Sequence, residues 1–155
     1  MKKLSHYDSK GRARMVDVTA KPATHRTAQA RAFVAMSAKV LKALPANPKG
    51  NPLEIARIAG IQAAKRTSEL IPMCHPLPLT HADVTTTIVK GGIEITASAA
   101  TTAPTGVEME ALTAASIAAL TIYDMCKALD KGIVIREITL EKKTGGKSGN
   151  YTRNR

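Results

Sequence analysis

Residues 106–135 read GVEMEALTAASIAALTIYDMCKALDKGIVI, a stretch that contains a long helix followed by the start of a strand. Small and apolar residues at helical spacing run from Glu110 to Asp130, and Lys131-Gly132 supplies a typical helix end. The alternation of apolar residues over Ile133–Leu140 then predicts a strand. The stretch therefore indicates a domain in which helices and strands share one core.

The sequence before this helix supplies the other elements. Two β-rich runs at 83–90 and 93–99, joined through Gly91-Gly92, predict a hairpin. Helical patterns at about 28–44 and 53–70 precede the hairpin, and alternation within 12–19 predicts a first strand. The order β, α, α, β, β, α, β predicts an α+β, ferredoxin-like fold, with helices packed on one face of an antiparallel sheet.

Length and composition predict one domain over residues 1–155, with flexible tails at about 1–11 and 150–155. Aromatic residues make up 3% of the chain and Trp is absent, so the core must consist of Ala, Ile, Leu, Val and Met. Two cysteines without a CxxC pair, the absence of a secretory pattern and the lack of a long apolar run predict a cytoplasmic protein that does not enter a membrane.

The formal charge of +11 and the isoelectric point near 10.0 imply an anionic partner. The basic residues are dispersed, and the few aromatic residues are too scattered to form the stacking platform of a single-strand binder. The partner could be nucleic acid, a membrane surface or a small polyphosphate, and charge alone does not choose among them, although the scattered aromatic residues make nucleic acid less favoured. A small basic RNA-binding module remains the alternative; a steep loss of tight RNA affinity with salt would support it.

The segment KRTSELIPMCHPLPLTH, residues 65–81, ends a helical pattern and then displays a histidine in extended chain. Prolines at 72, 76 and 78 stop a helix and favour extended backbone at the residues before them. His75 directly precedes Pro76, and rigid display suits an imidazole for proton transfer near neutral pH. A partly buried structural histidine is the alternative interpretation.

The long helix carries the other candidate acid and base groups. Asp124 and Lys127 lie three residues apart and share a face, either as an exposed ion pair or as a partly buried acid/base pair. The apolar surroundings favour partial burial, which would perturb both groups. Glu108 and Glu110 sit at the helix entrance, where carboxylates interact well with the helix dipole. Because Glu110 and Asp124 are about 21 Å apart along the axis, they cannot reach one small reacting centre from one helix. Either they serve different ends of the ligand, or a second subunit brings the other element.

The segment EKKTGGKSG, residues 141–149, is a Gly-rich basic tail that can offer N–H groups and ammonium groups to phosphate, or remain a solvated terminus. It is not a P-loop, because Glu141 stands where that motif needs glycine. Further candidate phosphate contacts are Lys21, Arg26, Lys49, Lys65 and Arg66. The spacing of Cys74, His75, His81 and Cys126 matches no standard zinc pattern, so no metal site is predicted.

Together, MCHPLPLTH, the 106–135 stretch, EKKTGGKSG, MVDVTAK near Met15 and ARIAGIQAAKRT near Ala56 resemble the cyclic pyranopterin monophosphate synthase family, the molybdenum cofactor biosynthesis protein C. The resemblance covers nearly the whole chain and implies the ferredoxin-like fold. It also implies a lyase that converts 3′,8-cyclo-7,8-dihydroguanosine 5′-triphosphate to cyclic pyranopterin monophosphate and pyrophosphate. No cofactor is implied, although Mg²⁺ can accompany the triphosphate.

The resemblance assigns roles to particular residues of this sequence. The catalytic pair matches Asp124 and Lys127. The substrate-binding residues match Met73, Cys74, His75, Glu108, Met109, Glu110, Lys21, Arg26, Lys49 and Lys143. The family further implies a homohexamer, built as a trimer of dimers, with sites at the dimer interface.

Overall fold

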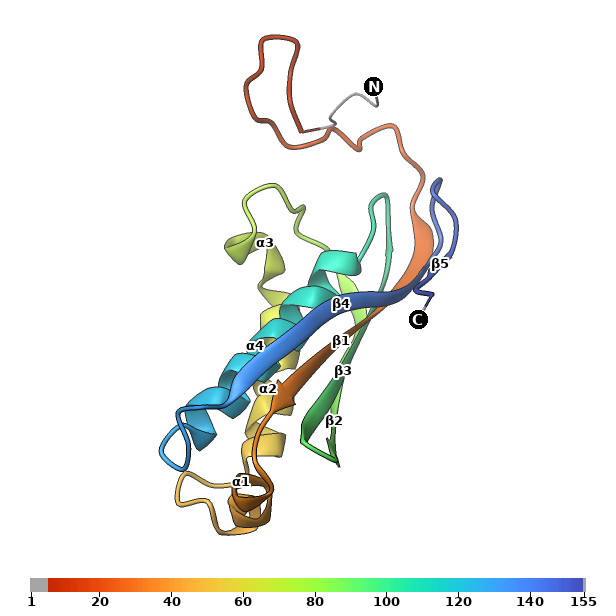
Figure 1. The fold of residues 1–155 in the computed structure, drawn as a ribbon. Helices are drawn as coiled ribbons and strands as arrows, with labels where there is room; N and C mark the ends of the chain where they lie inside the picture. Colours follow the sequence, from red (N-terminus) through yellow and green to blue (C-terminus); the bar gives the residue numbers. More distant parts are fainter. Residues whose placement is uncertain (1–5, 155) are drawn as a thin grey trace.

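Five strands form one antiparallel sheet in the order β2-β3-β1-β4-β5, and the helices cover one of its faces (Figure 1). The structure is a computed structural model and describes residues 6–154, so the predicted flexible tails fall partly in residues 1–5 and 155, outside the described residues. The elements are β1 (Thr24–Ala35), α1 (Ala38–Ala43), the 3₁₀ helix η1 (Leu44–Ala46), α2 (Pro52–Lys65), α3 (Thr67–Leu70), β2 (Leu79–Val89), β3 (Gly92–Ala103), α4 (Glu108–Cys126), β4 (Val134–Thr144) and β5 (Tyr151–Thr152).

The topology confirms the predicted α+β, ferredoxin-like fold. Strand β1 lies in the centre and pairs with β3 along its whole length, from Thr24 opposite Ala103 to Ala35 opposite Gly92. It also pairs with β4 on its other side. Two β-α-β units, β1-α2-β2 and β3-α4-β4, therefore interlock in one sheet, and their helices α2 and α4 lie side by side on the same face (Figure 1).

Alanine dominates the core, as the composition predicted. Buried alanines line β1, β3, α2 and α4. The largest fully buried side chains are aliphatic, led by Ile93, Ile95 and Ile122. These small side chains let α2 and α4 approach closely. At Gly60 of α2, an added Cβ would lie 2.8 Å from Val84 Cγ2 and 2.9 Å from the Ala114 carbonyl oxygen. The tight packing of α2 against α4 therefore fixes the position of α4, and with it both helix ends, relative to the sheet.

Two predicted elements are wrong. The helix predicted over 28–44 is strand β1 up to Ala35, and only Ala38–Ala43 is helical. Alanine, glutamine and arginine favour helix locally, but the alternation of buried and half-exposed residues in β1 suits a central strand under a tightly packed helix layer. Within residues 6–154, the strand predicted over 12–19 has no partner strand, and its one ladder contact is an isolated bridge between Tyr7 and Ala13.

The other predicted elements are confirmed with shifted ends. The helix predicted over 53–70 is α2 followed by the short α3, with the break at Arg66. The hairpin is β2 and β3, which are longer than predicted, and the long helix is α4, which ends at Cys126 rather than Asp130. The last strand, β4, runs on to Thr144. Among the described residues, no helix is both long and apolar enough to span a membrane.

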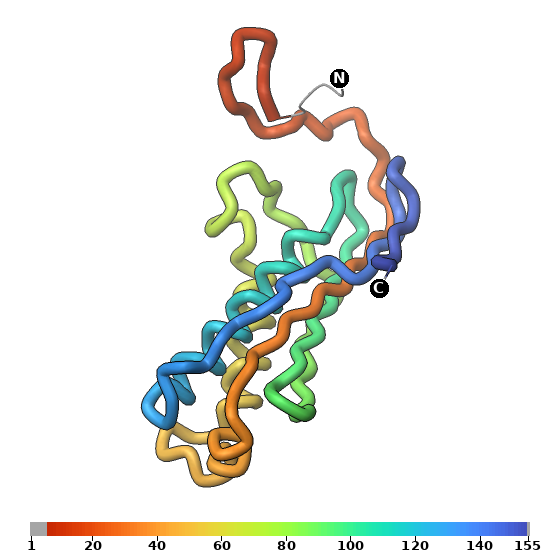
Figure 2. Tube along the Cα trace, in the orientation of Figure 1, coloured from red at the N-terminus to blue at the C-terminus, as the bar shows by residue number. Residues whose placement is uncertain are grey.

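Residues 6–23 form an arm that extends away from the sheet and helices before the chain enters β1 (Figure 2). Most of its side chains are exposed. One side chain ties it to the Pro-rich segment after α3: His75 Nε2 lies 2.7 Å from the Val16 carbonyl oxygen. Because a carbonyl can only accept, Nε2 is the donor. The arm thereby covers the N-terminal end of α4.

Candidate active site

The residues predicted to form the site lie in two groups at opposite ends of α4. Glu108, Met109 and Glu110 begin the helix, whereas Asp124 lies in its last turn with Lys127 directly after it. Since α4 is continuous and rises about 1.5 Å per residue, Glu108 and Asp124 are about 24 Å apart along its axis. One chain therefore holds the predicted site residues in two separate groups.

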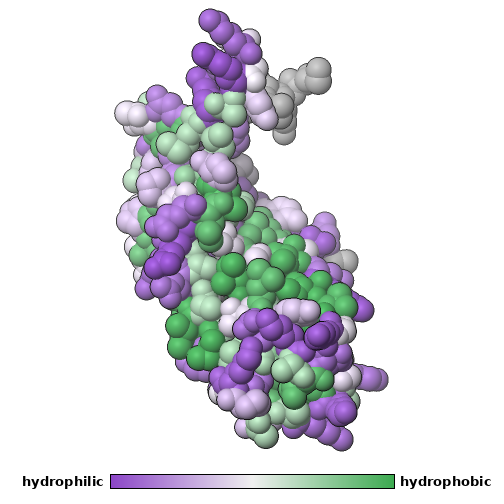
Figure 3. All heavy atoms as spheres, turned by 90° about the vertical axis from the view of Figure 1, so that its left-hand side faces the viewer, coloured by the Kyte–Doolittle hydropathy of each residue, from purple (hydrophilic) through white to green (hydrophobic). Residues whose placement is uncertain are grey.

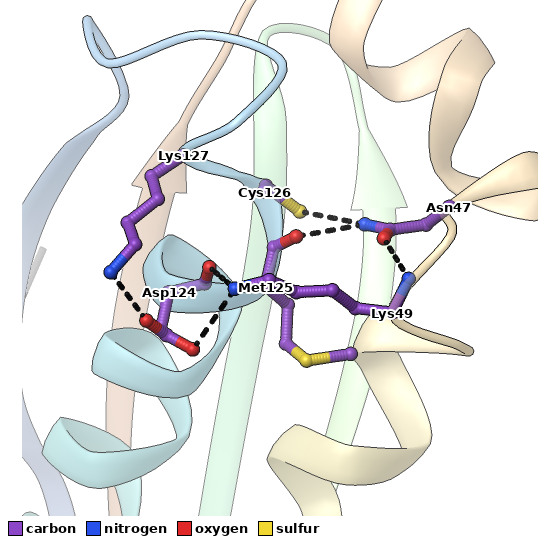
Figure 4. Close-up of polar contacts among 6 residues, drawn as sticks. All are labelled: Asn47, Lys49, Asp124, Met125, Cys126 and Lys127. Carbon is purple, nitrogen blue, oxygen red and sulfur yellow. Dashed lines mark hydrogen bonds and ion pairs between the residues drawn. The ribbon is translucent and has the colours of Figure 1, made fainter.

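At the C-terminal end of α4, two lysines hold Asp124 (Figure 4). Lys127 Nζ lies 2.7 Å from Asp124 Oδ1. Lys49 Nζ lies 3.5 Å from Oδ2 and donates to the Asp124 carbonyl oxygen at 2.9 Å. The loop that carries Lys49 is anchored by the buried Asn47, whose Nδ2 donates to the Met125 carbonyl oxygen at 2.9 Å. Asn47 Oδ1 also accepts from the Lys49 backbone N–H at 2.9 Å, so these contacts of Asn47 place Lys49 beside the carboxylate.

Ion pairing shifts the pKa values of Asp124 and Lys127. The hydrogen bond and charge of Lys127, together with the charge of Lys49, lower the pKa of Asp124. The hydrogen bond to Asp124 in turn raises the pKa of Lys127. The side chains of Asp124, Lys127 and Lys49 are 58%, 49% and 42% exposed, so the expected partial burial of the pair is wrong. The helix is apolar along its length, but its last turn opens to solvent, and both groups stay charged at neutral pH.

A cavity of about 330 Å³ lies at the N-terminal end of α4. The segment after α3 supplies Met73, Cys74 and His75, and the first turn of α4 supplies the residues 108–110. The arm contributes four further lining residues: His6, Val16, Val18 and Lys21. The prolines that prevent a helix in the 71–78 segment are the reason that it runs extended along the helix entrance. The structure therefore brings together the predicted Met73–His75 and Glu108–Glu110 segments.

Glu110 is the most strongly perturbed carboxyl group in this cavity. Its side chain is only 4% exposed, and burial raises its pKa to about 7, with a smaller contribution from the neighbouring charge of Glu108. Burial also raises the pKa of the Cys74 thiol, and the charge of Glu110 adds to the effect. Glu110 can therefore hold or release a proton near neutral pH, while Cys74 remains a neutral thiol.

A second cavity, of about 780 Å³, adjoins the first and is strongly cationic. The two cavities share four lining residues: Lys21, Thr105, Gly106 and Glu108. Arg26 is fixed there because its Nε donates to the Ala103 carbonyl oxygen at 3.0 Å. Lys143 Nζ forms an ion pair with Glu108 Oε1 at 2.9 Å. The joined cavities therefore offer several cations on one side and the acid/base groups His75 and Glu110 on the other.

The remaining candidates do not join these groups. Lys65 and Arg66 are exposed at the end of α2 and line neither cavity at the helix entrance. Cys126 is buried near the C-terminal end of α4, so it does not meet Cys74. Within residues 6–154, no group of three or more His, Cys, Asp or Glu side chains could hold a metal ion.

Sequence reasoning missed Asn47, Thr105, Gly106 and Ser148. Thr105 and Gly106 lie in the turn between β3 and α4. The one sequence signal that could have identified them as site residues is their position just before the Glu108–Glu110 segment. Asn47 lies in the PANPKGNP loop, where an asparagine between prolines is indistinguishable from an ordinary turn residue. The long-range hydrogen bond from Asn47 to Met125 appears only in the fold.

Comparison with known proteins identifies the family. Residues 15–146 match the MoaC family. A cyclic pyranopterin monophosphate synthase of Novosphingobium aromaticivorans is 57% identical over 97% of this chain and 98% of its own. Synthases of the same name from Desulfitobacterium hafniense and Parvibaculum lavamentivorans are 56% and 53% identical, again over 97% of this chain and over 94% and 96% of their own. The chain therefore belongs to the MoaC family.

Proposed function

We propose that this chain is a cyclic pyranopterin monophosphate synthase, a lyase of molybdenum cofactor biosynthesis. It converts 3′,8-cyclo-7,8-dihydroguanosine 5′-triphosphate to cyclic pyranopterin monophosphate and releases pyrophosphate. The observation that carries the proposal is the similarity to proteins of that name, at 53–57% identity over nearly the full length. The joined cavities support it, because one is cationic and the other is lined mainly by apolar and acid/base groups.

The proposed roles follow from the chemistry of each group. Asp124 and Lys127 are the catalytic pair and move protons while rings open and close. Lys21, Arg26, Lys49 and Lys143 neutralise the triphosphate directly or through neighbours. The segments Met73–His75 and Glu108–Glu110 contact the rest of the substrate. The reaction has no net redox change, so we assign no resident cofactor; Mg²⁺ would enter with the triphosphate.

We further propose that a second copy of the chain completes each site. The support is the separation of about 24 Å between the two groups of site residues, which is too long for one small substrate centre. A two-fold axis that places the C-terminal end of one α4 beside the N-terminal end of another unites them. The proposed assembly is a homohexamer, a trimer of dimers with the sites at the dimer interface.

The surface of the helix layer is compatible with such an assembly. Hydrophobic side chains gather across the face shown in Figure 3. Ile55 and Ile58 of α2 and Leu120 of α4 are each about half exposed, and α4 is apolar nearly all round. A helix of that composition is normally covered. The free thiols of Cys74 and Cys126 fit the reducing compartment of a cytoplasmic enzyme.

The direct test is turnover by the purified protein. Incubation with 3′,8-cyclo-7,8-dihydroguanosine 5′-triphosphate should give cyclic pyranopterin monophosphate, identified by mass spectrometry, and one equivalent of pyrophosphate. Incubation with GTP under the same conditions is the control and should release no pyrophosphate. Failure to form the product with a folded, correctly assembled protein would contradict the proposed function.

A further inference from the structure

The C-terminal end of α4 lacks the left-handed glycine that ends many helices. Lys127 ends the helix in the right-handed conformation instead, with φ −58° and ψ −23°. The last four carbonyl groups of a helix, here those of residues 123–126, need partners beyond its regular hydrogen bonds. The following backbone serves two of them: Lys127 N–H donates to the Tyr123 carbonyl oxygen, and Leu129 N–H donates to that of Cys126, both at 2.8 Å.

Side chains from one loop serve the other two carbonyl groups (Figure 4). Lys49 Nζ donates to the Asp124 carbonyl oxygen and Asn47 Nδ2 donates to the Met125 carbonyl oxygen, both at 2.9 Å. The two donor residues lie 75 and 78 positions before their acceptors, and Pro48 alone separates them. Two consecutive carbonyl groups of the helix are therefore bonded to one short segment of the loop between η1 and α2.

Asn47 is held by each of its polar groups. Its Oδ1 accepts from the Lys49 backbone N–H at 2.9 Å, which makes an Asx turn, and its Nδ2 donates to α4. Its backbone N–H donates to the Leu44 carbonyl oxygen at 3.2 Å, and its carbonyl oxygen accepts from Gly50 N–H at 3.0 Å. Pro48 favours the extended backbone seen at Asn47, with φ −65° and ψ 123°. This buried residue therefore joins the loop firmly to the helix.

The two side-chain bonds of Asn47 require a donor and an acceptor at once. The Met125 carbonyl oxygen needs a donor, and the Lys49 backbone N–H needs an acceptor. A carboxylate offers acceptors only, and a serine hydroxyl group can form the local turn but is too short to reach the helix as well. The amide of Asn47 therefore does more than form a turn, because it also connects that turn to α4.

The contacts of Asn47 leave Lys49 little freedom, since this lysine is bonded at both ends. Its backbone N–H donates to Asn47 Oδ1, and its Nζ donates to the Asp124 carbonyl oxygen. The same Nζ lies 3.5 Å from Asp124 Oδ2, while Lys127 Nζ pairs with Oδ1 at 2.7 Å (Figure 4). A lysine side chain is otherwise flexible, so an anchored backbone lowers the entropy cost of this arrangement.

We propose that Asn47 is a positioning residue for the group at the C-terminal end of α4: by bonding the loop to the Met125 carbonyl oxygen, it holds Lys49 on Asp124. This inference rests on the proposed function, in which Asp124 and Lys127 are the catalytic pair. Asn47 acts through Lys49 rather than by contact with the substrate. Small displacements of groups around a reacting centre lower the rate steeply, so the loss of this anchor should lower turnover.

Chemical labelling of lysines tests the placement of Lys49 without turnover. Reductive methylation of the full-length protein, followed by mass spectrometry of its peptides, gives a rate for each lysine. Asn47→Ala should raise the rate at Lys49 about threefold or more, because an ammonium group released from fixed acceptors reacts faster. Asn47→Ser, which keeps the local turn but not the bond to Met125, should raise it as well and is the milder change if Asn47→Ala does not fold. The rate at Lys42, exposed on α1, should not change.

Asn51→Ala is the matched control. Asn51 lies in the same loop, where its side chain accepts from the N–H groups of Leu53 and Glu54 and caps α2. Its loss should lower the melting temperature, as the loss of a helix cap does, but leave the labelling rate of Lys49 unchanged. A change at Lys49 that appears in the Asn47 variants and not in Asn51→Ala therefore separates positioning from general destabilisation.

Turnover by the same variants tests whether the placement serves catalysis. Asn47→Ala should lower kcat/KM about tenfold or more, whereas Asn51→Ala should stay within about twofold of the unmodified protein. Because Asn47 acts through Lys49, the double variant Asn47→Ala/Lys49→Ala should be no more than about twofold slower than Lys49→Ala alone. Losses that simply multiply in the double variant would show that Asn47 acts independently of Lys49 and would overturn the proposal.

The labelling results can also overturn the proposal. An unchanged Lys49 rate in both Asn47 variants would do so, and a rise in Asn47→Ala alone would show that the local turn suffices without the bond to α4. If the unmodified protein forms product and the Lys49 rate never changes, the positioning role alone is wrong. If both Asn47 variants release Lys49 but the unmodified protein forms no product, the proposed function is wrong and the anchoring of Lys49 by Asn47 stands.

Discussion

Asp124 and Glu110 are carboxylates on one helix in opposite settings. Two lysines lower the pKa of Asp124 at the open end of α4, whereas burial raises the pKa of Glu110 to about 7 at the other end. Asp124 is therefore ionised throughout the neutral range, and Glu110 is divided between its two protonation states. Environments that separate the pKa values of two acids are typical of sites in which the acids have different roles.

Asp124→Asn should lower the rate of product formation at least about a hundredfold, because it removes the charge and basicity but keeps the side-chain volume. The melting temperature should stay close to that of the unmodified protein, since the carboxylate is more than half exposed. Glu54→Gln, which removes an exposed carboxylate of α2, is the control for turnover and for melting. Unfolding of the Asp124 variant would instead indicate that the Lys49–Asp124–Lys127 group is structural.

Glu110 should make the protein less stable as the pH rises. In the unfolded chain the carboxyl ionises near 4.5, but in the folded protein its pKa is about 7. Between these values the folded state retains a proton that the unfolded state has lost. The free energy of unfolding therefore falls from about pH 4.5 to about pH 7, by up to roughly 3 kcal/mol, and this contribution is constant above that range.

Glu110→Gln should remove this fall, which urea unfolding at pH 5 and pH 8 can measure. Glu69→Gln, on the exposed surface of α3, should leave the difference between the two pH values unchanged. An equal pH dependence in the Glu110→Gln variant would show that another group causes it.

At the scale of the elements, the long helix, the hairpin and the last strand were predictable because their patterns and propensities agree. Strand β1 was not, because AQARAFVA consists largely of good helix formers. Its alanines are needed where α4 packs on the sheet, so tertiary packing overrides the local preference. The prediction of a strand over 12–19 was wrong because it also rested on a local pattern. Alternation of apolar and polar residues is compatible with a strand, but a strand also needs a neighbouring strand to pair with, which the local pattern does not reveal.

The parts of the candidate site that are short, local sequence motifs were predictable from the sequence. The segments Met73–His75 and Glu108–Glu110 were named from the sequence, and the fold brings them together. The exposure of Asp124 and Lys127 was not predictable from the sequence. The solvent accessibility of a helix end depends on how the following loop folds, and here the Asp124 side chain is 58% exposed. Asn47 and Ser148 were missed because their contacts join segments far apart in the sequence or follow from the loop's fold.

The close approach of α2 and α4 predicts the effect of Gly60→Ala. The new methyl group would meet the Ala114 carbonyl oxygen at 2.9 Å, which is backbone and cannot turn away. Overpacking costs about 1–3 kcal/mol, and the better helix propensity of alanine offsets about 1 kcal/mol. We expect a net loss of up to about 2 kcal/mol in urea unfolding, against less than about 0.5 kcal/mol in either direction for Gln62→Ala on the exposed side of α2. A more stable Gly60→Ala variant would show that the helices have room to separate.

At the scale of the whole molecule, α4 carries the proposed catalytic groups at one end and the proposed substrate-binding groups at the other. A single chain cannot bring Arg26 and Asp124 to one small substrate, since Arg26 lies in the cavity at the N-terminal end of α4. The proposed function therefore requires that Arg26 and Asp124 of each site come from different copies of the chain. The apolar outer face of the helix layer offers a surface over which copies can associate (Figure 3).

Co-expression of two inactive variants tests this central claim most directly. Arg26→Ala and Asp124→Asn should each be nearly inactive as homo-oligomers. In a mixed dimer both lesions fall in one site and leave the other intact, so random pairing should restore about a quarter of the unmodified activity under two-fold symmetry. If mass spectrometry confirms mixed oligomers and the assay shows no recovery, Arg26 and Asp124 act from the same chain, and the composite site is wrong.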